Sequence, residues 1–259
     1  MCPIITLTTD FGLADSYVGT MHGVILGICP TARVVDLCHN VSPQNVQQAA
    51  FVLYAAYRFF PPGTIHVVVV DPGVGSERRI IAVQTRDAYF VAPDNGVLSY
   101  VLAKETVLGQ VHLTRQEFWL PAISHTFHGR DIMAPVAAHL ARGVALCELG
   151  EPVEDLVKFA LPEPAVQPDG SIVGHILYVD RFGNLVTDVR EESLPSSQAL
   201  VIHCAGQRIK GIHATYASVG DGELVALVGS SGHLEIAVRN GSAAEVLRAQ
   251  VGDKIVIKG

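Results

Sequence analysis

Apolar and polar positions follow two rhythms along the first part of the chain. Short runs of aliphatic and β-branched residues predict strands at residues 3–10, 33–37, 64–71, 79–85 and 88–94. Longer segments with apolar residues at steps of three and four predict helices at residues 16–29, 43–60, 96–104 and 131–142. Because strands that alternate with helices are typical of βαβ units, we expect an α/β N-terminal domain with a mainly parallel sheet.

The pattern changes after residue 160. Residues 161–170 hold three prolines and a glycine, a composition typical of a linker. The later apolar segments are short and separated by turns that contain glycine; they are residues 171–180, 184–189, 199–206, 223–232, 233–238 and 253–259. This pattern predicts a smaller all-β barrel domain. The expected boundaries are 1–162 for the N-terminal domain, 163–170 for the linker and 171–259 for the barrel.

Composition and charge narrow the class of protein. Hydrophobic residues make up 49% of the chain and charged residues 17%, as in a folded protein with a sizeable core. A net charge of −7 without any basic run argues against a nucleic-acid partner. The five cysteines are widely spaced and include no C-x-x-C pair, which argues against a disulfide framework or a structural zinc site. With no signal-peptide pattern and no membrane-spanning apolar stretch, we expect a soluble cytoplasmic protein.

Aspartates follow several of the predicted strands. Asp10, Asp71 and Asp94 each end a strand of the N-terminal domain. Ligands of open α/β sheets bind beyond the carboxyl ends of the strands, so these carboxylates are expected to line one crevice. The alternative is that each one caps a local turn or helix. The loop at residues 73–78 has two of the three glycines of a dinucleotide-binding loop and no phosphate-binding lysine, which argues against a nucleotide-phosphate site.

Histidines add a second candidate feature. The segment HTFHGRD at residues 125–131 places His128 next to a glycine, where a backbone can approach a ligand closely. A structural role, with the ring nitrogens bonded to backbone, is the alternative. A metal site built from Asp10, His39, Asp71 and His128 also stays open, although no H-E-x-x-H motif or cysteine cluster is present.

A third candidate lies in the second half of the chain. Asp180, Phe182 and Asn184 combine an acid, an aromatic ring and an amide within five residues. This set can bind the hydroxyls, the flat base and the hydrogen-bonding edges of a nucleoside. It is equally typical of a β-turn whose polar side chains bond to the local backbone.

Six segments together resemble the S-adenosyl-L-methionine (SAM) hydroxide adenosyltransferases, relatives of the fluorinase and chlorinase enzymes. In chain order the segments are TDFG, HVVVVDPGVGSERR, APDNGVL, TFHGRD, DRFGNLVT and SSGHLEIAVRNGSAA. The resemblance extends from about residue 5 to the C-terminus. It implies an α/β domain and a β-barrel domain, assembled as a homotrimer with active sites between subunits. It also implies hydrolysis of SAM to adenosine and L-methionine without a metal or other cofactor.

The resemblance assigns roles to particular residues. The catalytic Asp, Arg and His of the family fall on Asp71, Arg78 and His128. Its substrate-binding positions fall on Asp10, Asp15, Ser16, Phe127, Asp180, Phe182, Asn184, Ser230, Ser231 and Glu235. Asp10 matches the position that binds the ribose hydroxyls, and the residues of the second half match positions that bind the amino-acid and adenine parts.

The expected reaction is in-line attack of an activated water or hydroxide on C5′ of the ribose. Asp71 and His128 would hold and deprotonate this water while Arg78 fixes the carboxylate, and which of the two accepts the proton is left open. The charge of Asp71 would repel a halide, and Gln44 stands where the fluorinase carries an aromatic ring, so fluorination is not expected. The alternatives are a non-catalytic adenosine or SAM sensor, a SAM-dependent halogenase that uses chloride, and a metal-dependent hydrolase.

Overall fold

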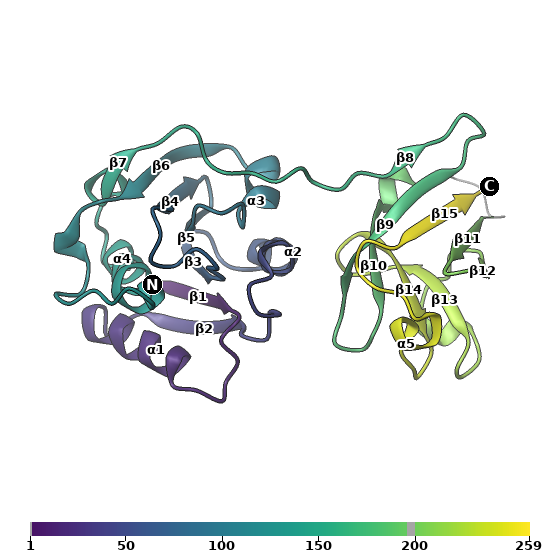
Figure 1. Ribbon diagram of the computed structural model, residues 1–259, viewed down its shortest axis with the longest axis horizontal. Coiled ribbons are helices and arrows are strands. Elements are labelled where there is room, and N and C mark those ends of the chain that lie inside the picture. Colours follow the sequence, from purple (N-terminus) through teal and green to yellow (C-terminus); the bar gives the residue numbers. More distant parts are fainter. Residues whose placement is uncertain (1, 196–199) are drawn as a thin grey trace. The chain divides into compact units, whose positions relative to one another are not determined.

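The computed structural model describes residues 2–195 and 200–259. Contacts divide the chain into two compact units, Met1–Ala160 (unit 1) and Leu161–Gly259 (unit 2), which are treated one at a time (Figure 1). The predicted strand at 199–206 begins at a residue outside the described ones. The predicted linker at 163–170 contains a two-residue strand, β8, which pairs with the long strand β9 of unit 2.

Unit 1 is built around a sheet with the strand order β2-β1-β3-β5-β4-β6-β7. The strands are β1 (Ile4–Thr9), β2 (Arg33–Cys38), β3 (Thr64–Val69), β4 (Ile80–Thr85), β5 (Ala88–Pro93), β6 (Val107–Leu113) and β7 (Gly150–Pro152). Strands β2, β1, β3 and β5 run parallel, while β4, β6 and β7 pair antiparallel with their neighbours. The sheet is therefore mixed, and the prediction of a mainly parallel sheet is wrong for its second half. The reason is that β4 and β5 form a tight hairpin through residues 86–87 instead of a helical crossover.

Helices cover both faces of this sheet (Figure 1). Helices α1 (Tyr17–Ile28) and α4 (Ala134–Ala141) pack together on one face, and α2 (Val46–Ala56) and α3 (Ser99–Lys104) pack together on the other. The four predicted helices are confirmed, with shorter ends. Strand β3 is buried at every position between these layers, as its unbroken apolar run predicts.

The connections of unit 1 distinguish the edge of the sheet at the carboxyl ends of β1 and β3. From β1 the chain passes through α1 to β2 on one side, and then through α2 to β3 on the other side of β1. The direction of winding thus reverses between β1 and β3. At such a switch point the two connections leave in opposite directions, so a crevice opens beyond the carboxyl ends of the strands.

Unit 2 is a barrel-like antiparallel sheet with the strand order β12-β11-β15-β9-β10-β14-β13. Its strands are β8 (Ala165–Val166), β9 (Ile172–Val179), β10 (Leu185–Arg190), β11 (Val201–Cys204), β12 (Gln207–Lys210), β13 (Leu224–Val228), β14 (His233–Val238) and β15 (Lys254–Lys258). A bridge between His213, just beyond β12, and Leu227 on β13 nearly closes the sheet. Alternate strand positions fill its apolar interior, and α5 (Ala243–Leu247) is a short helix of five residues.

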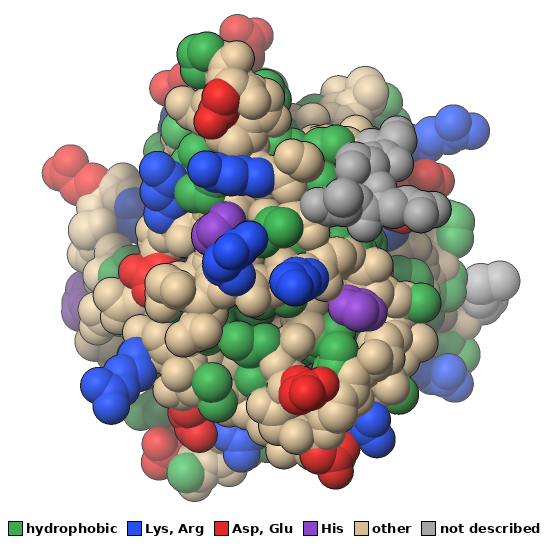
Figure 2. Space-filling view, turned by 90° about the vertical axis from the view of Figure 1, so that its right-hand side faces the viewer, with side chains coloured by type: hydrophobic (Ala, Val, Ile, Leu, Met, Phe, Trp, Pro, Cys, Tyr) green, Lys and Arg blue, Asp and Glu red, His purple; other side chains and the backbone are tan. Residues whose placement is uncertain are grey.

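The surface carries charges of both signs. On the face shown in Figure 2, Lys, Arg and His side chains lie near the middle, and both basic and acidic side chains lie toward the rim. All five cysteines are free thiols. Over the described residues, none of the helices combines the length and the apolar character needed to cross a bilayer.

Candidate functional site

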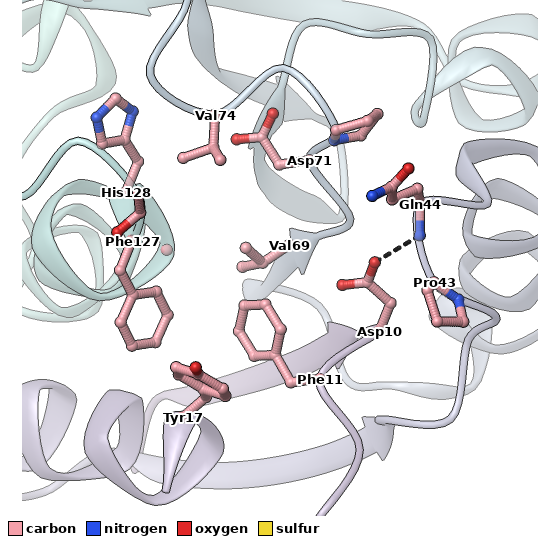
Figure 3. Close-up of a pocket in the computed structure, with 13 residues that line it drawn as sticks. Asp10, Phe11, Tyr17, Pro43, Gln44, Val69, Asp71, Val74, Phe127 and His128 are labelled. Atoms are coloured by element: carbon pink, nitrogen blue, oxygen red, sulfur yellow. Dashed lines mark hydrogen bonds between the residues drawn. The ribbon is translucent and has the colours of Figure 1, made fainter. Parts of the chain in front are cut away.

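A pocket of about 390 Å³ opens beyond the carboxyl ends of β1 and β3 (Figure 3). Asp10, which follows β1, and Asp71, which follows β3, lie on one side of it. Aromatic rings lie on the opposite side, and Val69 and Val74 lie between the two sides. The pocket thus occupies the switch point of the sheet and combines an acidic side with an apolar one.

Arg78 joins Asp71 to His128. Its Nε donates to both carboxylate oxygens of Asp71, at 2.9 and 3.0 Å, and its Nη2 donates to Oδ2 at 2.5 Å. The same Nη2 lies 2.9 Å from Nδ1 of His128. The side chains of Asp71 and Arg78 are only 5% and 11% exposed. Arg78 is not part of the pocket wall, so it lies behind the two side chains that face the cavity.

Two glycines allow this convergence. Gly75 adopts a φ of +79°, and a Cβ there would lie 2.5 Å from the backbone oxygen of His125, so the turn that leads from Asp71 back to Arg78 requires glycine. A Cβ on Gly129 would lie 2.8 Å from a methyl group of Val69. Gly129 also begins a single π-helical turn, Gly129–Met133, which precedes α4. Such turns are frequent at functional sites, and this one starts directly after His128.

The contacts of His128 determine which of its nitrogens carries the proton. A guanidinium nitrogen can only donate, so Nδ1 of His128 must accept and the proton of the neutral ring lies on Nε2. Burial, followed by the positive charge of Arg78, lowers the pKa of His128 below 6.5. The imidazole is therefore neutral near pH 7, and its Nε2–H is a donor.

The second carboxylate of the pocket is fixed by backbone. Asp10 accepts a hydrogen bond of 2.7 Å at Oδ2 from the amide of Gln44, drawn as the dashed line in Figure 3. Gln44 has a φ of +64°, an uncommon conformation for a residue other than glycine. This conformation turns its amide toward Asp10, so the carboxylate has a defined direction before any ligand binds.

Three rings form the apolar side of the pocket. Phe11, Tyr17 and Phe127 lie with ring centroids 5.2 to 5.5 Å apart, in tilted or edge-to-face arrangements. The sequence analysis named Phe127 but missed Phe11 and Tyr17. Asp15 and Ser16, which the resemblance also names as substrate-binding positions, are exposed at the start of α1 and are not among the residues that line this pocket. A signal was available, because an aromatic residue directly follows the acid at the end of β1.

Asp94 does not join Asp10 and Asp71. It is 2% exposed at its side chain and accepts hydrogen bonds from the Arg79 guanidinium and from the amide of Val157. The expectation that all three strand-end aspartates line one crevice is therefore wrong for Asp94. Asp94 directly follows β5, and Val157, whose amide it accepts from, belongs to the segment that precedes unit 2. The carboxylate of Asp94 therefore holds this segment against the end of β5.

Unit 2 gathers a second group of polar residues. Asp180 accepts from the backbone amides of Phe182 and Asn184 and from the side-chain amide of Asn184, at 2.8 to 2.9 Å. These bonds are those of a closed turn, as the alternative interpretation of this segment predicts. Phe182 in this turn is 76% exposed.

A buried acid lies near this turn. Glu235 on β14 accepts a 2.5 Å hydrogen bond from the hydroxyl of Tyr216. Burial raises the pKa of Glu235, and the charge of Asp180 adds to that rise although the Tyr216 bond opposes it. Ser230 and Ser231 form the turn between β13 and β14 and lie largely at the surface. Within unit 2, the turn at Asp180 thus lies close enough to Glu235 for the charge of Asp180 to affect Glu235.

The metal site considered from the sequence does not form. Asp10, Asp71 and His128 line the pocket, whereas His39 is buried against Thr9 and Asp36. Across residues 2–195 and 200–259, no three His, Cys, Asp or Glu side chains are grouped in a way that suits a metal ion.

Both halves of the chain match one family. The model of the SAM hydroxide adenosyltransferase N-terminal domain matches residues 5–150, and that of the C-terminal domain matches residues 174–256. The chain belongs to the SAM hydroxide adenosyltransferase family. The resemblance inferred from the six sequence segments is thereby confirmed, and each family domain lies within one unit of the structure.

Two kinds of named relative are similar to this chain over most of its length. The (R)-S-adenosyl-L-methionine hydrolase of Salinispora tropica is 41% identical over 259 residues, which cover 98% of this chain and 97% of that protein. The fluorinase of Actinopolyspora mzabensis is 28% identical over 276 residues, 93% of this chain and 92% of the fluorinase. Among solved structures, an uncharacterized conserved protein from Thermotoga maritima is similar with a TM-score of 0.92 and 38% identity, covering 98% of this chain and 100% of that one.

Proposed function

We propose that this protein hydrolyses SAM to adenosine and L-methionine by attack of a water-derived oxygen on C5′ of the ribose. The observation that carries the proposal is the Arg78 guanidinium that holds Asp71 and His128 together at the wall of the pocket. The kinship to the hydrolases, closer than that to the fluorinases, supports the same reaction.

The donor and acceptor directions around Arg78 suggest a role for each group. The carboxylate of Asp71 accepts from Arg78 and still has lone pairs for a further donor. Nδ1 of His128 is occupied by Arg78, so Nε2–H is its remaining polar group. A water between them would donate one hydrogen to Asp71 and accept from His128. In this arrangement Asp71 accepts the proton and His128 orients the oxygen.

This division of roles fits the chemistry at C5′. The leaving group is the neutral thioether of methionine, which departs from a sulfonium and needs no protonation. The difficulty lies in the nucleophile, because water is weak and hydroxide is scarce near neutral pH. A carboxylate held rigidly by a cation increases the nucleophilic character of the bound water as its bond to carbon forms, without any large movement of the protein.

The remaining pocket groups are assigned to the substrate. Asp10, oriented by the Gln44 amide, is proposed to accept from the ribose hydroxyls. The rings of Phe11, Tyr17 and Phe127 would attract the positive sulfonium through their faces and exclude water around it. Together these groups would hold C5′ in line between the bound water and the sulfur.

The residues of unit 2 are proposed to bind the other parts of SAM. The family positions that contact the amino-acid and adenine parts fall on the Asp180 turn, on the turn with Ser230 and Ser231, and on Glu235. The homotrimer with active sites between subunits stays a prediction of the family resemblance. Light scattering on the purified protein tests it, since a monomer would contradict the predicted assembly.

The direct test is a product assay. Purified protein with SAM should release adenosine and L-methionine in equal amounts, and the absence of both over hours would refute the hydrolase. Tight adenosine binding without products would indicate a sensor. Formation of 5′-chloro-5′-deoxyadenosine in chloride would indicate a halogenase. Loss of activity with a chelator, restored by a divalent ion, would indicate a metal-dependent hydrolase.

A further inference from the structure

A chain of polar contacts, buried at His39 and Thr9 and exposed at Asp36, lies behind the pocket loop that carries Asp10. Oδ1 of Asp36 lies 3.0 Å from Nε2 of His39, and Nδ1 of His39 lies 2.9 Å from the hydroxyl of Thr9. The hydroxyl of Thr9 in turn accepts a 3.2 Å hydrogen bond from the amide of Phe11. The side chain of His39 is 4% exposed, and Thr9 is fully buried.

The proton positions along this chain follow from its two ends. The amide of Phe11 can only donate, and the carboxylate of Asp36 can only accept. The negative charge of Asp36 beside Nε2 favours the proton of His39 on that nitrogen, although Nε2 is not aligned for a hydrogen bond, and Nδ1 then accepts from the hydroxyl of Thr9. The aligned hydrogen bonds are those from Thr9 to His39 and from the Phe11 amide to Thr9, while Nε2 of His39 has no hydrogen-bond partner among the described residues. From His39 through Thr9 to the Phe11 amide, each group fixes the direction of the next.

The backbone of His39 holds the same loop at a second point. Its carbonyl oxygen accepts a 2.8 Å hydrogen bond from the amide of Gly12. The loop that presents Asp10 and Phe11 to the pocket is thus attached to His39 on both sides of these two residues. On the far side, His22 donates to Asp36 at 2.7 Å and so limits the movement of that carboxylate.

We infer that His39 is a positioning residue, which through Thr9 fixes the Asp10 loop in the conformation that binds the ribose and the sulfonium. The inference rests on the proposed function for the identity of the ligand but not for the geometry of the loop. Asp36 contributes only through its charge beside His39. None of these three side chains lines the pocket.

Two neighbouring threonines provide a matched test. Thr8 and Thr9 are adjacent on β1 and both fully buried, but the hydroxyl of Thr8 has no hydrogen-bond partner among the described residues. Thr9→Val removes the link between His39 and Phe11, whereas Thr8→Val makes the same chemical change without breaking a bond. In hydrogen exchange on the free protein, Thr9→Val should raise the exchange rate of the Phe11 amide about fivefold, the effect of losing one typical hydrogen bond. Thr8→Val should leave it unchanged.

Kinetics add a readout that a purely structural role would not change. Thr9→Val should raise the KM for SAM about fivefold while kcat changes less than about twofold, because the reacting groups are untouched. At position 39, His39→Asn keeps an acceptor near the place of Nδ1, whereas His39→Leu fills the buried space without one. The Asn variant should therefore have the lower KM, even if the Leu variant is the more stable.

The outcomes separate the two proposals. If the wild type hydrolyses SAM but Thr9→Val matches Thr8→Val in amide exchange and KM, the positioning role is refuted and the proposed function stands. Increased exchange in Thr9→Val alone supports the positioning role even if the protein forms no adenosine, an outcome that would refute only the proposed function.

Discussion

Replacement of Asp71 by Asn tests the proposal that Asp71 accepts the proton. The change keeps the size of the side chain and one oxygen for Arg78, but it removes the negative charge from a site that is 5% exposed. Since general acid–base groups contribute about 10² to 10⁴ in rate, we expect kcat to fall by about a thousandfold. Adenosine affinity should change less than about threefold, because Asp10 and the rings supply that binding in the proposed site.

The same replacement also affects stability, and a control must separate the two effects. Loss of one partner from a largely buried ion pair costs about 2–4 kcal/mol, because the Arg78 cation stays behind with fewer acceptors. Asp94→Asn provides the control: Asp94 pairs with Arg79 at 2.6 Å, is 2% exposed and lies outside the pocket. It should also lower the free energy of unfolding, but it should retain wild-type kcat.

The assay measures the initial rate of adenosine release at saturating SAM, with adenosine quantified by chromatography. The reaction is run at a temperature at which circular dichroism shows both variants folded. Two results would refute the reasoning about Asp71. One is an Asp71→Asn variant that keeps more than about a tenth of wild-type kcat, which is inconsistent with loss of a general base. The other is an Asp94→Asn variant that loses activity to the same extent.

Four further outcomes are expected. Phe127→Leu should raise the KM for SAM about tenfold with kcat nearly unchanged, since one ring face contributes about 1–2 kcal/mol to binding a cation; an unchanged KM would contradict this. Gly75→Ala should lower the free energy of unfolding in urea by about 2 kcal/mol or more, because its φ is positive and an added Cβ meets a backbone oxygen; stability equal to wild type would contradict it. Because burial and the charge of Arg78 lower the pKa of His128 below 6.5, kcat/KM should stay level as pH falls to 6.5 and decline only at lower pH, and a decline centred above 6.5 would oppose the neutral imidazole. Burial lowers the pKa of His66 to about 4, so between pH 6.5 and pH 4 mainly the unfolded state gains this proton. The free energy of unfolding should therefore drop by about 3 kcal/mol by pH 4, and the His66→Phe variant should lack this part of the pH dependence.

The fold of unit 1 was predictable where the pattern of residues has one physical interpretation. The all-apolar run of β3 requires cover on both faces, and the structure has it. The antiparallel half of the sheet was missed because residues 86–87 form a two-residue hairpin turn without the glycine or asparagine that usually marks one. In unit 2, short strands separated by glycine-containing turns sufficed to predict a barrel-like sheet.

The candidate site was predictable in part. Asp10 and Asp71 follow from the rule for strand ends, but the same rule failed for Asp94, whose partner Arg79 is brought beside it by strand pairing. The convergence of Arg78 and His128, 50 residues apart, came from the family resemblance and not from spacing. The contribution of Gln44 could not be predicted, because it depends on a backbone amide turned by a positive φ.

The network of His39 shows a further limit. The sequence analysis considered this residue only as a metal ligand, because histidine with nearby acids suggests coordination. The structure instead places it in a buried chain that ends on a backbone amide. Such a role depends on which side chains face each other across β1 and β2, and a single sequence does not specify this register.

The central claim is that a water held by Asp71 and His128 attacks C5′ of the ribose. Hydrolysis of SAM in water enriched in the heavy oxygen isotope, with mass spectrometry of both products, tests it most directly. The account predicts that adenosine carries one heavy oxygen at its 5′ position and that methionine carries none. Unlabelled adenosine, or a label in the amino-acid product, would show that a different bond is broken and would contradict the account.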